Sequence, residues 1–130
     1  MSTPQTFPYE TRLNILHPPL DLIDVNALAA SATHKWFNQT LCKVNGSVVR
    51  AGIIEGEYHW HKHDHDDEFF YVVDGELLID LEDRQMGSSM VSLAPGQGLV
   101  VPKGVPHRTR APRRSIILMV ENAGIIPTGD

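Results

Sequence analysis

Cysteine, net positive charge and long apolar runs are scarce in this chain. Cys42 is the single cysteine, so no disulfide can close within the chain, and its strand-like surroundings favour a buried structural thiol. The net charge of −5 argues against a nucleic-acid partner bound through phosphates. No stretch approaches the roughly 18 apolar residues of a membrane span, and no basic residue of the kind that opens a signal peptide precedes Arg12. We therefore expect a soluble, cytoplasmic protein with no nucleic-acid or membrane partner.

Long helical patterns are also scarce, whereas turn residues are frequent. The 130 residues suit one domain, and they include nine prolines and ten glycines. From residue 35 onward, short β-rich runs alternate with turn signals, and Asn45-Gly46 and Asp74-Gly75 are typical of hairpins. Short antiparallel strands at even spacing predict an all-β barrel or double-sheet jelly roll. Besides the histidine-rich segment described below, the expected strands are 36–44, 47–54, 69–73, 76–82, 90–93, 99–101, 107–111 and 115–121.

The first part of the chain has a different pattern. Four prolines within residues 1–20 prevent a sustained helix, so this part is expected to be an extended arm or, as the alternative, a disordered tail. Asp24 is a suitable N-cap for a short helix over 25–33. The predicted organisation is one domain with an arm and short helix at 1–34, a β-barrel at 35–121 and a tail at 122–130. One strand in the arm is favoured by the alternation of Phe7, Tyr9, Leu13 and Ile15.

Four of the seven histidines fall in one short window, His59, His61, His63 and His65. In an extended strand, residues i and i+2 point to the same side, so His61 and His63 present two imidazoles to one face. The turn that follows can bring Glu68 back opposite them. Imidazole and carboxylate are ligands of divalent first-row metals, and this pattern predicts a metal site.

Two motifs resemble those of the cupins. Gly56, His61, His63, Glu68 and Gly75 read G-x4-H-x-H-x4-E-x6-G, one residue shorter after the first glycine than the usual first cupin motif. The second motif is matched at four positions, with Ala111 where the family has asparagine; the matching residues are Gly96, Pro102, Gly104 and His107. The chain looks most like small single-domain bacterial cupins, often labelled mannose-6-phosphate isomerase-like.

The resemblance implies a cupin-type double-stranded β-helix, that is, a jelly-roll barrel. It also implies one divalent ion, of Zn, Mn, Fe, Ni, Co or Cu, with one or two positions left open to water or substrate. The expected metal ligands are His61, His63, Glu68 and His107.

Residues beside the expected ligands have open roles. His59 has the same strand parity as His61, so it is either a hydrogen-bonded core histidine or a catalytic acid–base or substrate-contacting group. Phe70 shares parity with Glu68 and is expected to line the substrate pocket, whereas His65 is expected in a solvated turn. Trp60, Phe69 and Tyr71 are expected to face outward. Together with the N-terminal arm, these aromatic residues predict a homodimer.

Two functions remain open at this point. The first is a metal-dependent enzyme of isomerase or dioxygenase type that acts on a small polar metabolite. The second is a non-catalytic module that binds a metal or a small ligand, because one fold hosts many functions. No residues remain for an attached DNA-binding domain, which favours the enzyme.

Overall fold

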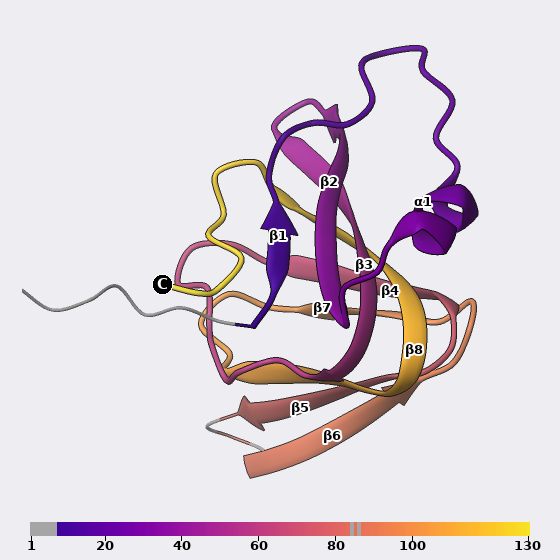
Figure 1. Cartoon of the computed structure of the whole chain (residues 1–130). Coiled ribbons are helices and arrows are strands. Elements are labelled where there is room, and N and C mark those ends of the chain that lie inside the picture. Colours follow the sequence, from indigo (N-terminus) through magenta and orange to yellow (C-terminus); the bar gives the residue numbers. More distant parts are fainter. Residues whose placement is uncertain (1–7, 84, 86) are drawn as a thin grey trace, which may run out of the picture.

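The structure is a computed structural model and describes residues 8–83, 85 and 87–130. It contains one helix, α1, at Val25–Ser31 (Figure 1). The prediction of an all-β fold with one short helix is confirmed. The strands are β1 at Glu10–Arg12, β2 at Trp36–Val44, β3 at Ser47–Glu57, β4 at Glu68–Asp74, β5 at Leu77–Asp83, β6 at Gly87–Leu93, β7 at Gly98–Val101 and β8 at His107–Asn122.

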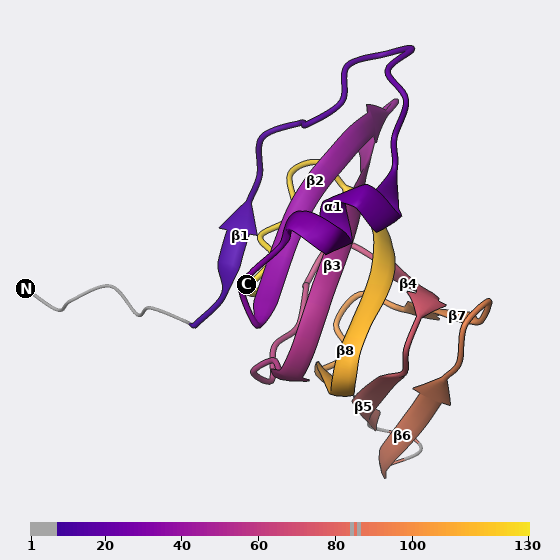
Figure 2. The same cartoon turned by 45° about the vertical axis from the view of Figure 1, so that its right-hand side comes forward.

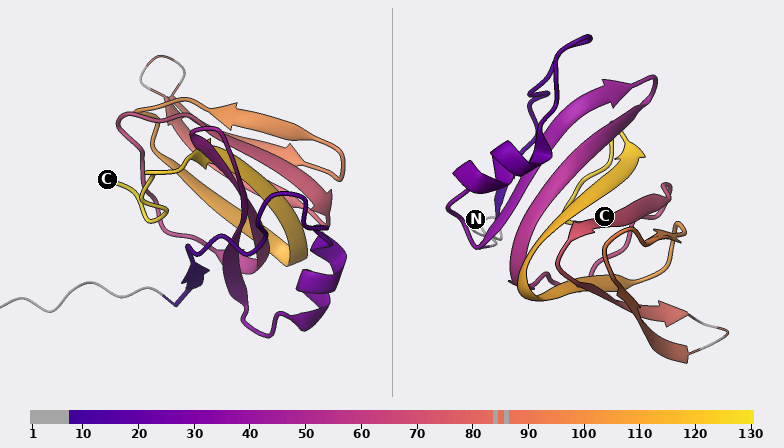
Figure 3. Two further views of the ribbon diagram at one scale, coloured as in Figure 1. Left: turned by 90° about the horizontal axis from the view of Figure 1, so that it is seen from above. Right: turned by 90° about the vertical axis from the view of Figure 1, so that its right-hand side faces the viewer.

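The long strand β8 holds the sheet together. Along one edge it pairs with β3 from Ser47↔Asn122 to Glu57↔Arg110. Along its other edge, β5 pairs with the beginning of β8 and β4 with its end. The hairpin partner β6 extends the sheet beyond β5, and β7 extends it beyond β4, so the sheet curls around an interior (Figure 3). This curl brings the starts of β4 and β8 toward the same interior, where Glu68 and His107 lie.

Both faces of β2 and β3 are buried, for different reasons. Trp36 and Ile54 point into the interior core, whereas Phe37 and Ile53 belong to a second cluster on the outer face. The helix α1 covers that outer face with Leu28 and other apolar side chains (Figure 2). Asp24 accepts a hydrogen bond from the Ala27 backbone N–H at 3.0 Å, as expected of an N-cap. The helix therefore buries the second face of a sheet that would otherwise expose apolar side chains to water.

Two strand predictions are wrong in detail. Residues 107–111 and 115–121 form one strand, because Pro112 lies where the β3–β8 register shifts between Ile54 and Gly56. A proline at such a bulge removes no ladder hydrogen bond. The strand expected at 90–93 is longer, since β6 already begins at Gly87.

The histidine-rich segment, which the sequence predicts to be a strand, is not one. Residues 58–67 form an extended connection between β3 and β4, and its one bridge joins His61 to His107. The strict alternation expected of a paired strand therefore does not apply here.

The N-terminal segment runs along β2. Residues Glu10–Arg12 pair with β2 in parallel, and the backbone N–H of His17 donates to the Leu41 carbonyl at 2.8 Å. This bears out a strand in the arm, although Phe7 lies outside the described residues. Among residues 8–83, 85 and 87–130, no helix has the length and apolar character needed to cross a membrane.

Candidate metal centre

Four side chains from three parts of the chain meet in the interior. His61 and His63 come from the connection between β3 and β4, Glu68 begins β4 and His107 begins β8. One potential ligand atom from each lies within 4.8 Å of all the others. The two halves are joined by backbone hydrogen bonds, because His61 and His107 exchange N–H···O bonds of 3.0 and 2.8 Å. The four residues that the sequence singled out as metal ligands are thus brought together.

Backbone carbonyls orient two of the imidazoles. Nδ1 of His61 lies 3.0 Å from the carbonyl oxygen of His59, and Nδ1 of His107 lies 2.9 Å from that of Val105. A carbonyl only accepts, so each Nδ1 carries the proton and each Nε2 keeps a lone pair for a ligand. Such hydrogen bonds to the second ring nitrogen are the usual way in which proteins orient metal-binding histidines.

The buried polar atoms of the cluster fit a metal ion better than they fit one another. Among the described residues, Glu68 Oε1, His107 Nε2 and both ring nitrogens of His63 have no hydrogen-bond partner. Glu68 Oε1 lies 3.4 Å from His107 Nε2 and 3.5 Å from His63 Nε2. Atoms that share one ion at bonds of about 2.0–2.1 Å are separated by about 3–3.5 Å. Buried polar groups are normally satisfied, so the donor set suits a divalent ion.

A cavity of about 30 Å³ opens beside the cluster. It touches both His61 and Glu68, so a small molecule in it would lie against the ligand residues. Its other walls are partly aromatic, with Tyr58 and Phe70, and they also carry the buried ion pair of Arg50 and Glu121. Phe70, which the sequence predicts to line a substrate pocket, lies in this wall.

Burial and neighbouring side chains together shift the pKa values of the groups around the cavity. Burial, and next the nearby His107, lowers the pKa of His61 to about 4. Burial alone would raise the pKa of Glu68, but the facing imidazoles of His107 and His63 outweigh it and hold this pKa well below its usual range. Burial and the neighbouring Glu68 raise the pKa of Glu121. A neutral His61 beside an ionised Glu68 is the state in which both can bind a cation.

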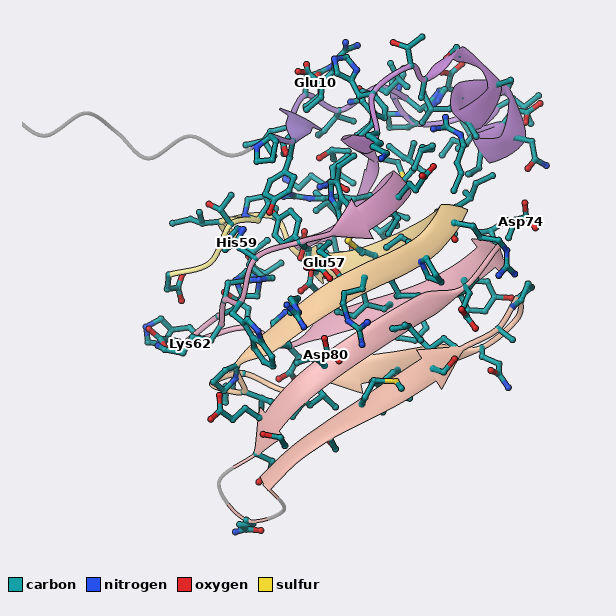
Figure 4. The ribbon with its side chains drawn as sticks, turned by 60° about the horizontal axis from the view of Figure 1, so that its bottom comes forward. Glu10, Glu57, His59, Lys62, Asp74 and Asp80 are labelled. Carbon is teal, nitrogen blue, oxygen red and sulfur yellow. The ribbon has the colours of Figure 1, made fainter. Side chains whose placement is uncertain are left out.

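His59 lies elsewhere than its sequence parity suggests. Its Nε2 is 2.8 Å from the Thr128 carbonyl oxygen, and its ring stacks near Tyr9 and Tyr58. Figure 4 shows His59 beside the C-terminal tail. It is not among the residues that line the cavity, whereas its neighbour Tyr58 is. Residues 58–67 do not form a paired strand, so side chains there need not alternate. Tyr58 and His61 can therefore both line the cavity despite their opposite parity.

Three further cavity residues did not stand out in the sequence. Arg50 interrupts an apolar strand and Glu121 directly follows the apolar run 116–120, which is the signal that could have identified them. Tyr58 carries no such signal. Burial, followed by the nearby Tyr9 hydroxyl, raises the pKa of Tyr58 well above its usual range, and its hydroxyl faces the Pro127 carbonyl at 3.4 Å. His65 is exposed, as expected for a residue in a turn.

Comparison with known proteins identifies the fold family. The Cupin domain family matches residues 49–121, which span β3 to β8 and include all four residues of the cluster. The chain belongs to the cupin family. The resemblance seen in the two sequence motifs is thereby confirmed.

Three proteins show the range of similarity to this cupin. It is 40% identical over 96 residues to the uncharacterized protein YdbB of Bacillus subtilis (strain 168), covering 74% of this chain and 81% of that protein. A crystal structure of a cupin-2 domain containing protein from Shewanella frigidimarina superposes with a TM-score of 0.70 at 29% identity, covering 78% and 94% of the two chains. An acireductone dioxygenase of Tuber melanosporum is 28% identical over 97 residues, which are 72% of this chain and 54% of that enzyme.

Proposed function

We propose that this cupin binds one divalent metal ion through His61, His63, Glu68 and His107 and is a dioxygenase-type enzyme for a small polar metabolite. One observation carries the proposal. Buried nitrogen and oxygen atoms of the four-residue cluster have no hydrogen-bond partner among the described residues, and a cavity opens beside His61 and Glu68. An ion with four protein ligands keeps one or two coordination positions open, as catalytic sites require.

The side chains of the cupin have separate tasks in such a site. The carbonyl oxygens of His59 and Val105 fix the imidazoles of His61 and His107. Phe70 and Tyr58 exclude water from one wall of the cavity, which strengthens the electrostatic interactions inside it. When bound, a first-row ion supplies Lewis acidity and, if it is redox-active, a means of bringing substrate and dioxygen together.

Dioxygenase chemistry is supported by the relative that is named acireductone dioxygenase, over 72% of this chain. None of the three relatives described above is named an isomerase, although the same four residues would also suit an ion that acts as a Lewis acid. The non-catalytic alternative is favoured by one observation, the volume of about 30 Å³, because cavities that hold metabolites typically measure about 300–1,000 Å³. Turnover therefore has to be measured directly.

The test begins with metal content. Elemental analysis of the purified protein should give about one divalent ion per chain, and His107→Ala should lose at least about ten-fold in affinity for it. His65→Ala is the matched control, because His65 is an exposed histidine in the same segment as His61. Equal metal content in all three proteins would refute the site.

The second step measures oxygen uptake. Protein loaded with Fe(II), Mn(II), Ni(II) or Zn(II) is offered a panel of enediols, ketones, diols and sugar phosphates in an oxygen-electrode cell. The proposal requires oxygen uptake with at least one redox-active ion and none with Zn(II) or with His107→Ala. Isomerised product without oxygen uptake would identify an isomerase instead. Tight metal binding with no turnover on any compound would favour the non-catalytic module.

A further inference from the structure

A buried arginine faces the same cavity as the metal cluster. Arg50 lies on β3 within the apolar run from Ser47 to Ile54 and is 4% exposed. It lines the cavity together with His61 and Glu68. A guanidinium stays charged at any relevant pH and carries five N–H donors, so burying one is costly unless its donors are used.

Those donors are poorly used by the protein itself. Arg50 Nε lies 2.9 Å from Glu121 Oε1, but neither Nε nor Nη1 has a hydrogen bond of acceptable geometry to any described residue. Arg110 provides the contrast, because its Nε and Nη2 hold both oxygens of Asp80 in a two-pronged pair at 2.7 and 2.9 Å. An arginine with a purely structural role would be expected to pair in this way. Arg50, which lines the cavity, instead has two buried donors that no described residue satisfies.

The charges around the cavity favour an anion once a metal ion is bound. A divalent ion brings two positive charges and Arg50 a third, against the carboxyl groups of Glu68 and Glu121. With both carboxylates ionised, the net buried charge is one positive; with Glu121 protonated, it is two. An anionic ligand is therefore favoured in either protonation state of Glu121.

We propose that Arg50 binds the carboxylate of the substrate, so that the substrate is a small carboxylic acid with a further oxygen that faces the four-ligand cluster. This inference rests on the proposed metal site and narrows its substrate class. Register supports the arrangement, because Glu121 lies opposite Glu68 on neighbouring strands and Arg50 contacts Glu121. The ligand then spans from the cluster past this pair to Arg50. The cavity of about 30 Å³ is far smaller than ordinary metabolite sites, so the ligand has to be a molecule of only a few non-hydrogen atoms.

Glycolate and its neutral amide, glycolamide, are suitable probes because they have nearly the same shape and differ in charge. Their binding is measured by calorimetry on Zn(II)-loaded protein, which cannot turn over by redox chemistry. Charge-assisted hydrogen bonds predict that glycolate binds about 10- to 100-fold more tightly than glycolamide. The double variant Arg50→Gln/Glu121→Gln should lose this preference while keeping its zinc, since it removes both charges of the pair together and leaves no buried charge unpaired. Arg113→Gln, on an exposed arginine, is the control and should keep the preference.

The outcomes separate this inference from the metal site. Zinc content is measured first, and a wild-type protein without zinc would refute the proposed function and this inference together. If zinc binds but wild-type protein takes up glycolate and glycolamide equally, the carboxylate subsite is wrong and the metal site stands. The same holds if the double variant keeps the preference, because the charge of the metal alone would then explain it. If the double variant does not fold, the wild-type comparison and the variant Arg50→Lys still test the carboxylate subsite. Arg50→Lys keeps the positive charge but loses the planar guanidinium, so it should lower the preference for glycolate over glycolamide.

Discussion

The imidazole of His61 makes the metal-free cupin sensitive to mild acid. Burial, and next the nearby His107, lowers the pKa of His61 to about 4, whereas an unfolded histidine titrates near 6.5. Between these values the unfolded chain binds a proton that the folded chain refuses. The contribution of His61 to stability is therefore fully present above pH 6.5 and is lost as the pH falls toward 4.

The magnitude follows from the two pKa values. Linkage gives a loss of about 2 kcal/mol at pH 5 and about 3 kcal/mol at pH 4, relative to pH 7.5. Either figure is a large share of the roughly 5–15 kcal/mol that stabilises an ordinary domain. Bound metal should suppress the effect, because a cation and a proton compete for the same Nε2.

Urea unfolding of chelator-treated protein from pH 7.5 to 4 measures this term. The free energy of unfolding of the wild type should fall more steeply than that of His61→Gln, and the gap between the two should change by about 2 kcal/mol by pH 5. His65→Gln is the control, because His65 is exposed in the same segment, and it should follow the wild type. Parallel curves for wild type and His61→Gln would show that burial does not hold His61 neutral.

Three further predictions concern packing, chemistry and assembly. Gly75→Ala should lower the free energy of unfolding, measured with urea, by about 1–3 kcal/mol, because Gly75 has φ of +92° and an added Cβ would lie 2.8 Å from Ser115 Cα. Gly46→Ala is the control and should lower it less, because a Cβ at Gly46 meets nothing within 4 Å. If His59 has the predicted acid–base role, His59→Gln with full metal content should lower turnover and flatten the pH profile of turnover. Wild-type turnover at every pH would show that His59 has only a structural role, through its contacts with Tyr9 and Thr128. The predicted homodimer should appear in light scattering at micromolar concentration, since Trp60 is 44% exposed, and a monomer there would contradict it.

Local pattern in the sequence was sufficient to predict most strands and the four residues that cluster in the interior. Alternating β-rich runs and the turns at Asn45-Gly46 and Asp74-Gly75 predicted β2 to β5 to within three residues at each end. The two histidine motifs predicted which side chains converge, because their spacing reflects the turns that return the chain to one interior. Phe70 lines the cavity on the same side as Glu68, because β4 is a paired strand in which their shared parity holds.

Parity failed where the backbone is not in a ladder. Residues 58–67 make one bridge, so no continuous pairing imposes alternation, and Tyr58 lines the cavity in place of His59. The hydrogen bond from His59 to Thr128, which joins residues 69 positions apart, could not be foreseen from local pattern. The merging of two predicted strands into β8 likewise depends on a bulge against β3.

The sequence by itself determined that this chain is a β-rich cupin with three histidines and a glutamate at the spacing of a metal site. Only the tertiary structure decided what faces that site. Arg50, Glu68 and Glu121 belong to β3, β4 and β8, and they meet because β8 pairs with both of the other strands. Such non-local pairing depends on the closure of the whole sheet, so no local pattern reveals that a buried guanidinium and two carboxyl groups share one cavity with His61.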